Sequence, residues 1–352
     1  MRPHGRVLIV SLGSTQGLRR ADEELRDSLG RAGAQVQIAR ARAPAPARTL
    51  MLTDLGWARA ARAASARALA EAEARGARPP AVVYSSATAA LLWPRPGAVR
   101  FDAAAAGNRP GRHGLWQRPL ERRRLAQAPL LLPWSEGGLR EAPDAARAGD
   151  RAVVVPVPVE PSGPPQAPEG RDIAAITYAA NPLKKGLDRV LAAWSRVREE
   201  LPADGPRELV VAGVSAEELR AARVDPAAVP GVRVVGRLAS VEYRGLVRRA
   251  RVFVCAPRRE DYGIAQLEAL ADGCLLVSTP APGPYAALPI ARALDERLVG
   301  EDLTRSLRAA LLDPHTDYSS RALESLRPFT REAADRIVAS ELLPRMLDQG
   351  RE

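Results

Sequence analysis

The sequence of 352 residues predicts an α/β protein built from two doubly wound domains, each with a parallel sheet covered by helices on both faces. Three observations support this class. Apolar strand-like runs alternate with helical segments over the first 155 residues, a segment with six prolines follows at 156–168, and the alternation then restarts. Proline cannot continue a helix or a central strand, so the middle segment is expected to be a linker.

The predicted boundaries follow from this arrangement. The first domain covers 1–158 and the second covers 159–330, while a closing helix at 331–352 is expected to pack back toward the first domain. Two such domains in tandem are expected to face a central ligand cleft, because ligands of doubly wound sheets bind at the carboxyl ends of the strands.

In the first domain, a continuous apolar run at Val7–Leu12 predicts a strand covered on both faces. A glycine-bearing loop follows, and Leu18–Arg31 has apolar residues at helical spacing until Gly33 ends the helix. Further strands are expected at Gln35–Ala39, Ala81–Tyr84, Ala98–Phe101, Leu130–Pro133 and Ala152–Val159, with an alanine-rich helix at Asp54–Arg75.

In the second domain, short apolar runs again alternate with longer amphipathic ones. The predicted strands are Ile173–Tyr178, Leu209–Ala212, Val232–Val235, Val252–Cys255 and Leu275–Ser278. The predicted helices are Leu187–Glu200, Val241–Ala250, Ile264–Ala271, Glu301–Leu312 and Thr330–Leu347.

The composition is that of a globular protein, with 46% apolar and 26% charged residues. Cys255 and Cys274 lie in or beside apolar runs and are expected to be reduced core thiols. His4, His113 and His315 are scattered, so no metal site is expected. No apolar run has the length of a signal peptide core or a membrane span, and the expected location is the cytoplasm.

The net charge of +11 belongs to the first half of the chain. Residues 1–160 contain 25 arginines and 14 acidic residues, while the remainder is balanced. A positively charged first half favours an anionic partner, namely acidic lipid headgroups at the inner membrane face or a phosphorylated acceptor. Coding bias toward arginine is an alternative explanation of the charge. Nucleic acid is not expected as a partner, because aromatic residues are only 4% and no nucleic-acid-binding motif occurs.

The most informative segment runs from Glu260 to Gly273. Gly263 is expected to start a helix whose free N–H groups can hold phosphate oxygens. Glu268 falls on this helix where the pattern of Ile264 and Leu267 calls for an apolar side chain, and a carboxylate there is costly unless it has hydroxyl partners.

A second segment carries the only two lysines of the chain, Lys184 and Lys185, beside fifty arginines. They lie between a predicted strand and a predicted helix. A compact ammonium group beside a pyrophosphate is a common way to neutralise its charge.

Together these segments resemble the family 4 glycosyltransferases, a retaining GT-B group. Glu260 and Glu268, separated by seven residues and followed by Ala269, Leu270, Ala271 and Gly273, match the family's acidic motif, and Lys185-Gly186-Leu187-Asp188 matches its Lys-Gly stretch. The resemblance covers about 170–330 and is faint over 1–160. It implies the GT-B fold and a nucleotide-sugar donor held by the second domain.

The resemblance also implies roles for individual residues. Glu268 would bind the nucleotide ribose, Glu260 the sugar hydroxyls, and Lys185 the pyrophosphate of the leaving group. Backbone amides of Gly263 and Ile264 would contact sugar or phosphate, and Gly13 and Gly17 would form the loop of the first domain that approaches the donor. No metal is implied, and the chain has no Asp-x-Asp triplet.

Two departures from the family pattern remain. Ala180 stands where the family usually has an arginine that clamps phosphate, and Asn181 or Lys184 would have to compensate. The family often has a histidine near the sugar in the first domain, and Asp102 and His113 are both candidates for that place.

The sequence therefore favours a metal-independent retaining hexosyltransferase. Its donor would be a GDP- or UDP-sugar, which acts as co-substrate, and no other cofactor is expected. Its acceptor would be a sugar, glycolipid or other anionic molecule, reached by peripheral membrane contact of the basic first domain. The alternative is a non-catalytic GT-B-like protein that binds nucleotides or serves as a scaffold.

Overall fold

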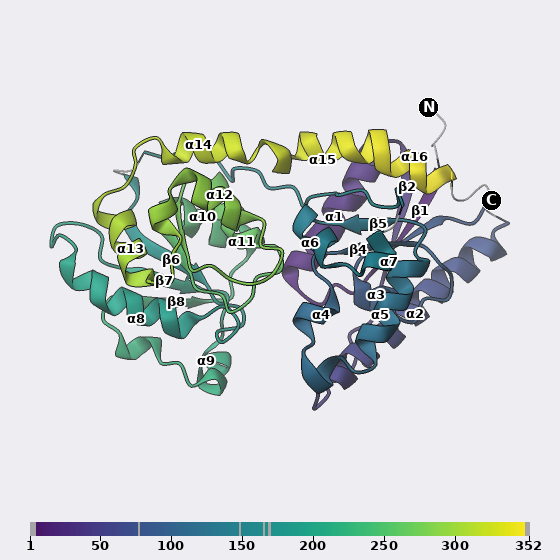
Figure 1. Ribbon diagram of the computed structural model, residues 1–352, viewed down its shortest axis with the longest axis horizontal. Coiled ribbons are helices and arrows are strands. Elements are labelled where there is room, and N and C mark those ends of the chain that lie inside the picture. Colours follow the sequence, from purple (N-terminus) through teal and green to yellow (C-terminus); the bar gives the residue numbers. More distant parts are fainter. Residues whose placement is uncertain (1–4, 77, 148, 165, 168–169, 349–352) are drawn as a thin grey trace. The chain divides into compact units, whose positions relative to one another are not determined.

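The computed structural model describes residues 5–76, 78–147, 149–164, 166–167 and 170–348 (Figure 1). It forms two units, Met1–Pro158 with Pro328–Glu352, and Val159–Arg327. Each unit has its own five-stranded sheet, and every pairing between neighbouring strands is parallel. Of the predicted linker 156–168, positions 165 and 168 lie outside the described residues.

The sheet of the first unit has the order β2-β1-β3-β4-β5. Its strands are β1 (Gly5–Ser11), β2 (Ala34–Arg40), β3 (Ala81–Tyr84), β4 (Ala98–Phe101) and β5 (Leu131–Pro133). Its helices are α1 (Gln16–Arg31), α2 (Leu50–Ala74), α3 (Ala87–Ala90), α4 (Ala105–Asn108), α5 (Gln117–Gln127), α6 (Glu136–Glu141), α7 (Asp144–Arg147), α15 (Arg331–Ile337) and α16 (Leu343–Asp348), the last two joined by a π-helical turn at Val338–Leu342.

Helices cover this sheet on both faces. Alternate residues of each strand point to opposite sides, so apolar residues of β1 face the helices on either side. Leu8 and Val10 of β1 pack in one apolar cluster with residues of α2, α3 and α5. Val7 and Ile9 pack in a second cluster with residues of α1 and of the C-terminal helices. The continuous apolar run at the start of the sequence is thus explained by burial of both faces of β1.

The C-terminal helical segment is fastened to α1 by polar contacts as well as by apolar packing. Asp335 accepts hydrogen bonds from Ser28 Oγ at 2.5 Å and from Arg31 Nε and Nη2 at 2.6 and 2.8 Å. Arg331 pairs with Glu24 at 3.2 Å. In Figure 1 the yellow α15 and α16 lie over α1 and the edge of this sheet, so the first unit is assembled from both ends of the chain.

The apolar run at 152–159 differs from its prediction as a strand. Only an isolated bridge joins Ala152 to Leu131, after which Val153 and Val155 donate their N–H groups to Leu131 and Pro133. Pro156 and Pro158 lack the N–H group that would continue the ladder. Val153, Val155, Val157 and Val159 are nevertheless buried, and this burial accounts for the apolar character of the run.

The sheet of the second unit has the order β10-β9-β6-β7-β8. Its strands are β6 (Ile173–Tyr178), β7 (Leu209–Ala212), β8 (Val232–Gly236), β9 (Ala250–Cys255) and β10 (Leu275–Ser278). Its helices are α8 (Leu187–Val197), α9 (Ala216–Ala222), α10 (Ser240–Arg249), α11 (Ile264–Ala271), α12 (Ala287–Leu294), α13 (Leu303–Leu312) and α14 (Tyr318–Ser325).

The direction in which successive strands are added to this sheet reverses between β6 and β9. After β6 the chain adds β7 and β8 on one side, then returns to add β9 and β10 on the other. Right-handed crossovers therefore place the connecting helices on opposite faces. Such a reversal opens a crevice beyond the carboxyl ends of the two central strands, which is where open α/β sheets bind ligands.

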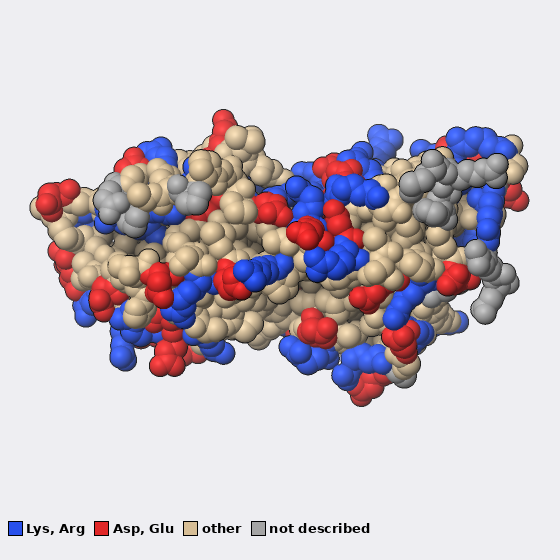
Figure 2. All heavy atoms as spheres, turned by 90° about the horizontal axis from the view of Figure 1, so that it is seen from above, with Lys and Arg blue, Asp and Glu red and all other residues tan. Residues whose placement is uncertain are grey.

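Charged side chains on the surface are mixed in sign on the face that Figure 2 presents. Blue arginine and lysine side chains alternate with red acidic ones, and no continuous basic patch covers this face. The positive surplus of the first half of the chain is therefore not gathered into one patch on this side of the molecule. Among the described residues, no helix combines the length and apolar character needed to cross a membrane.

Candidate functional site

Most of the donor-binding residues that were predicted in the second unit lie in two loops at its strand reversal. The segment after β6 carries Asn181, Lys184 and Lys185, and the segment after β9 carries Glu260 and Gly263. Because β6 and β9 are neighbours in the sheet, their carboxyl ends bring these two loops together. Residues more than seventy positions apart in the sequence thus share one site.

The two loops approach so closely that only glycine fits at one position. Gly186 has φ of +66°, and an added Cβ would lie 1.9 Å from the carbonyl oxygen of Ala256. The backbone N–H of Arg258 donates to the carbonyl of Lys184 at 2.9 Å, which ties the loops directly. Asn181 shapes the first loop, since its Oδ1 accepts the Lys184 N–H at 3.0 Å and its carbonyl accepts the Lys185 N–H at 2.8 Å.

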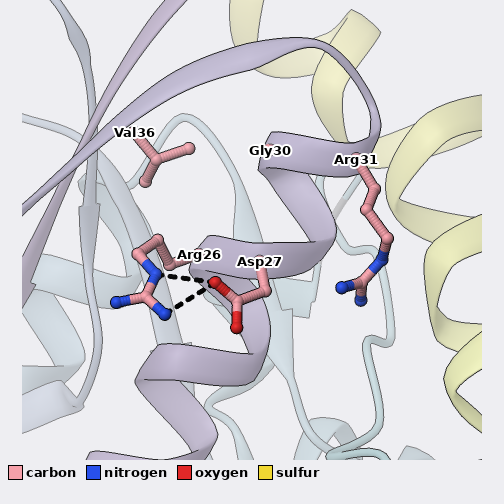
Figure 3. A pocket seen from close by; sticks show the side chains of 5 residues that line it. All are labelled: Arg26, Asp27, Gly30, Arg31 and Val36. Carbon is pink, nitrogen blue, oxygen red and sulfur yellow. Dashed lines mark hydrogen bonds and ion pairs between the residues drawn. The ribbon is translucent and has the colours of Figure 1, made fainter.

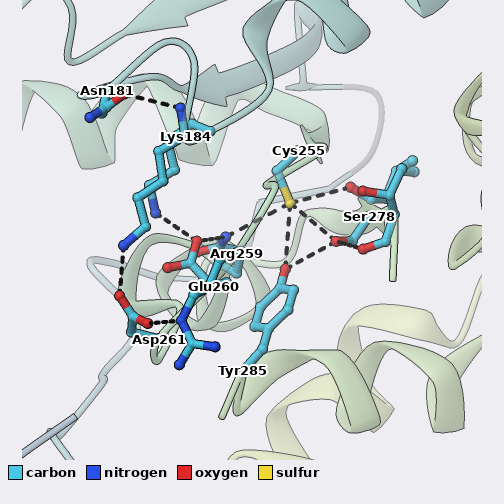
Figure 4. A network of polar contacts seen from close by, with 12 residues as sticks. Asn181, Lys184, Cys255, Arg259, Glu260, Asp261, Ser278 and Tyr285 are labelled. Carbon is cyan, nitrogen blue, oxygen red and sulfur yellow. Dashed lines mark hydrogen bonds and ion pairs between the residues drawn. The ribbon is translucent and has the colours of Figure 1, made fainter. Parts of the chain in front are cut away.

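Two ion pairs join the lysines to the acidic residues of the second loop (Figure 4). Lys185 Nζ lies 2.6 Å from Glu260 Oε2, and Lys184 Nζ lies 2.6 Å from Asp261 Oδ2. Asp261 also pairs with Arg259 at 3.0 Å. Glu260 is only 5% exposed, so its charge needs the lysine partner in this environment.

A buried polar network that begins at Gln266 holds the Glu260 carboxylate in place. Gln266 Nε2 donates to Glu260 Oε2 at 2.9 Å and lies 3.8 Å from the sulfur of Cys255. Cys255 in turn contacts Ser278 and the Tyr285 hydroxyl, both at 3.4 Å. Burial raises the pKa of the Cys255 thiol, so this cysteine stays protonated at neutral pH.

Gly263 begins helix α11 in a left-handed conformation, with φ of +90°. An added Cβ would lie 2.8 Å from the Tyr285 ring, so this position also requires glycine. Within the described ranges, no side chain caps the first turn of α11. Its N–H groups, beginning with that of the half-buried Ile264, are therefore available for an anion.

Glu268 of α11 is buried, 6% exposed, and its carboxylate lies 3.3 Å from Arg244 Nη1. The sequence predicted hydroxyl partners for this acid and missed the arginine. In a chain with fifty arginines, one more arginine on a helix gives no signal. The pairing arises because α10 and α11 pack against each other in the folded protein.

The predicted site residues of the first unit lie in separate loops. Gly13, with φ of +57°, follows β1, and its carbonyl accepts a hydrogen bond from Arg19 at 2.7 Å. Gly17 lies in the first turn of α1. Asp102 is half-buried at the carboxyl end of β4, where its carboxylate accepts the Ala103 N–H at 2.8 Å. His113 is exposed and lies in a 3₁₀ turn at Gly111–Gly114.

Glu121 of α5 is a titratable residue of the first unit that the sequence did not indicate. It is 4% exposed and accepts the Ala105 N–H at 2.7 Å, next to the turn that carries Asp102. Burial raises its pKa from 4.5 to about 7, against smaller opposing effects of the Ala105 N–H and of Arg109. A single glutamate in a polar helical segment has no pattern that would reveal this burial.

A surface pocket of about 490 Å³ lies elsewhere on the first unit, along α1 (Figure 3). Among its lining residues, Arg26 and Asp27 point toward each other and pair at 2.7 Å, while Arg31 donates a hydrogen bond to Asp335. Val36 and Gly30 complete its lining. None of the predicted site residues lines it. Within the described part of the chain, no group of three or more histidine, cysteine, aspartate or glutamate residues is placed to hold a metal ion.

Comparison with known proteins bears on the site just described. Residues 172–313 match the family model for glycosyl transferases group 1. This match contains both lysines, both glutamates of the acidic motif and the two central strands of the second sheet. No curated protein matches the chain.

Solved structures match over nearly the whole chain. WaaG, a glycosyltransferase involved in lipopolysaccharide biosynthesis, is 15% identical, with a TM-score of 0.66 over 95% of this chain and 100% of its own. Anabaena HepE, in complex with UDP and glucose, is 12% identical, with a TM-score of 0.68 over 96% and 99%. Sucrose-phosphate synthase from Thermosynechococcus elongatus is 15% identical, with a TM-score of 0.71 over 98% and 100%.

At such identities the structural likeness establishes the fold. Both parallel-sheet domains match those of GT-B glycosyltransferase structures, which confirms the predicted fold class of two doubly wound α/β domains. In addition, residues 172–313, which lie in the second unit, are similar to the group 1 glycosyl transferase family model.

Proposed function

We propose that the protein is a retaining glycosyltransferase that moves a hexose from a GDP- or UDP-sugar to an anionic or lipid-linked acceptor. The observation that carries the proposal is the Lys185–Glu260 pair at the strand reversal of the domain that matches the glycosyltransferase family. HepE, which shares the fold, is recorded with UDP, glucose and UDP-glucose.

The chemistry of the site suits a diphosphate leaving group. During transfer, the bond between the anomeric carbon and the diphosphate oxygen breaks, and the electron pair leaves with the nucleoside diphosphate. The acceptor oxygen takes its place on the same face of the sugar, and the acceptor proton passes to the released diphosphate. Lys185 and the uncapped N–H groups at Ile264 would stabilise the developing negative charge.

Sugar and nucleotide would be held by the two glutamates. Glu260, fixed by Lys185 and Gln266, would accept hydrogen bonds from the sugar hydroxyls, and Glu268 would accept from the ribose. Lys184 and Arg259, which both contact Asp261, supply further positive charge where Ala180 replaces the arginine usual in the resembling family. We propose on this basis that no divalent metal is needed, and EDTA should leave the transfer rate unchanged.

The test is a screen of thermal stability with GDP, UDP, ADP, TDP and their sugar conjugates. A ligand at 100 times its dissociation constant should add about 2.7 kcal/mol. One nucleotide should stabilise the wild type and Glu301→Ala, an exposed control in the same unit, but not Glu268→Ala. Equal stabilisation of the wild type and Glu268→Ala would contradict the assigned site.

The alternative of a non-catalytic nucleotide-binding or scaffold protein rests on Ala180 and on the absence of an alignable histidine in the first domain. Slow hydrolysis of the donor without acceptor distinguishes the two functions, because a transferase performs it and a scaffold does not.

The retaining mechanism has its own test. The anomeric configuration of the released sugar, followed by NMR, should match that of the donor. Inversion would contradict the retaining mechanism.

A further inference from the structure

Arg244 is a buried and extensively paired cation beside the proposed nucleotide site. It lies on α10 with 5% exposure, and three of its nitrogens reach three different acceptors. Nε donates to Asp272 Oδ2 at 2.6 Å, Nη1 to Glu268 Oε1 at 3.3 Å, and Nη2 to the carbonyl of Glu160 at 2.8 Å. One guanidinium plane thus holds α11 through Glu268, the residue that ends this helix through Asp272, and the segment that enters the second unit.

The partners of Arg244 are themselves fixed. Asp272 follows α11 directly, and its two carboxylate oxygens accept the N–H and the hydroxyl of Ser162 at 2.7 and 2.9 Å. Burial would lower the pKa of Arg244, but the hydrogen bond to Asp272 and the charge of Glu268 outweigh it and raise that pKa. The guanidinium is therefore permanently charged and has little freedom to move away from Glu268.

The geometry leads to a role that neither the family match nor the sequence assigns. We propose that Arg244 is a positioning residue that fixes the Glu268 carboxylate for the ribose hydroxyls and so determines the preference for ribonucleotides over dideoxyribonucleotides. This rests on the proposed function, in which Glu268 accepts hydrogen bonds from the ribose. A nucleotide without these hydroxyl groups should bind much more weakly to a carboxylate held in one orientation, because the buried acceptor is then left unpaired.

Substitution by lysine separates this role from simple charge compensation. Lysine keeps the positive charge but has one ammonium group in place of the planar fork, and it cannot hold Asp272, Glu268 and the Glu160 carbonyl in one arrangement. Glu268 in Arg244→Lys should therefore adopt several orientations. Arg249→Lys is the matched control, because Arg249 lies on the same helix, is exposed and pairs with Asp172 outside the site.

The experiment measures dissociation constants of UDP and 2′,3′-dideoxy-UDP, and of GDP and 2′,3′-dideoxy-GDP, by calorimetry on the full chain. We expect the wild type and Arg249→Lys to bind the preferred ribonucleotide about 10- to 100-fold more tightly than its dideoxy form. In Arg244→Lys this ratio should fall to about 3-fold or less. In the background of Glu268→Gln, where the ratio is already small, Arg244→Lys should change it little further.

A wild-type ratio in Arg244→Lys would overturn the inference. With unchanged dissociation constants it would show that Glu268 needs no such support, and with both dissociation constants raised equally it would show a merely structural role. If Arg244→Lys fails to fold, Asp272→Asn provides the second variant. It removes the charge that holds Arg244 Nε and should also lower the ratio, and an unchanged ratio there would equally overturn the inference.

Failure of the proposed function gives a different result. In that case the wild type binds neither UDP nor GDP, and both proposals fall together. If the wild type binds one of them and discriminates against its dideoxy form while Arg244→Lys does the same, only the role of Arg244 is lost.

Discussion

Glu121 shows how the environment of a single carboxyl group makes stability depend on pH. Its folded-state pKa of about 7 lies above its ordinary value of 4.5, chiefly because of burial. As the pH rises from 4.5 to 7, the unfolded chain loses this proton and the folded chain keeps it. The group therefore lowers the free energy of unfolding increasingly over this window, by about 3 kcal/mol at full ionisation.

Glu121→Gln removes this dependence, because the amide can still accept the Ala105 N–H but does not ionise. We expect the free energy of unfolding of the variant to increase by about 2 kcal/mol relative to that of the wild type between pH 5 and pH 8. Urea unfolding at the two pH values, followed by a signal of the first unit, measures it. The exposed control Glu136→Gln should keep the wild-type dependence of unfolding free energy on pH. If the difference in unfolding free energy between Glu121→Gln and the wild type is the same at both pH values, Glu121 is ionised in the folded protein.

Gly186 illustrates a residue that the site cannot replace. An alanine there would combine a left-handed φ of +66° with a Cβ 1.9 Å from the Ala256 carbonyl oxygen. Gly186→Ala should destabilise the second unit by about 2 kcal/mol or more and weaken nucleotide binding, because the two loops must separate. Gly205→Ala is the control, since its nearest neighbour would lie at 3.7 Å and its φ is not in the left-handed region. Thermal melts with and without nucleotide would detect both effects, and similar melts for the two variants would contradict the argument.

The residues of the candidate site differ in how readily the sequence reveals them. The lysine pair and the two glutamates could be selected because their types are unusual at their positions. Arg244 and Glu121 could not, since their roles come from partners on other elements and neither residue type is rare in this chain. The ion pairs of the lysines with Glu260 and Asp261 follow from strand order, which is set by long-range packing rather than by local sequence.

At the scale of elements, the strands were predictable wherever an apolar run is buried on both faces. The run at 152–159 misled the prediction because burial alone does not make a strand. Pro156 and Pro158 leave it without N–H groups for the ladder. The π-helical turn at Val338–Leu342 could not be predicted from the sequence either, because the apolar spacing of the C-terminal segment is close to that of an ordinary helix.

The contact of α15 with α1 gives a prediction about this element. Asp335 is held by Ser28 and Arg31, and Asp335→Asn should destabilise the first unit by about 1–2 kcal/mol. Burial raises the pKa of Asp335, but its hydrogen bonds lower it more, so the folded-state pKa lies below its ordinary value of 3.8. The stabilisation is present above that value and is lost as the pH falls through the folded-state pKa.

The measurement compares urea unfolding of the wild type and Asp335→Asn at pH 7 and near pH 3. The difference between the two proteins should be largest at pH 7 and should shrink at pH 3. Glu332→Gln, whose exposed partner is Arg336 on the same helix, should differ little from the wild type at either pH. A difference that stays constant with pH would mean that the charge of Asp335 does not carry the contact.

At the scale of the whole molecule, the uneven charge remains the feature with a functional implication. The first 160 residues carry the entire net charge of +11, yet the face in Figure 2 mixes both signs. We expect weak binding to vesicles that contain 30% anionic lipid at low salt, decreasing steeply as the ionic strength reaches 0.15 M or more. Co-sedimentation with anionic and neutral vesicles measures it. Binding to both kinds alike, or to neither, would contradict peripheral contact through the basic half.

The first unit is completed by residues from the far end of the chain, and this affects the order in which a newly made chain can fold. Its core includes Val338, Leu342, Leu343 and Met346, which the ribosome adds only after the whole second unit has been made. During synthesis, at about 5–20 residues per second, the face of the first sheet that these residues cover remains open. The second unit is thus the first that can fold to completion, and this apolar face of the first unit stays exposed until the closing helix has been translated.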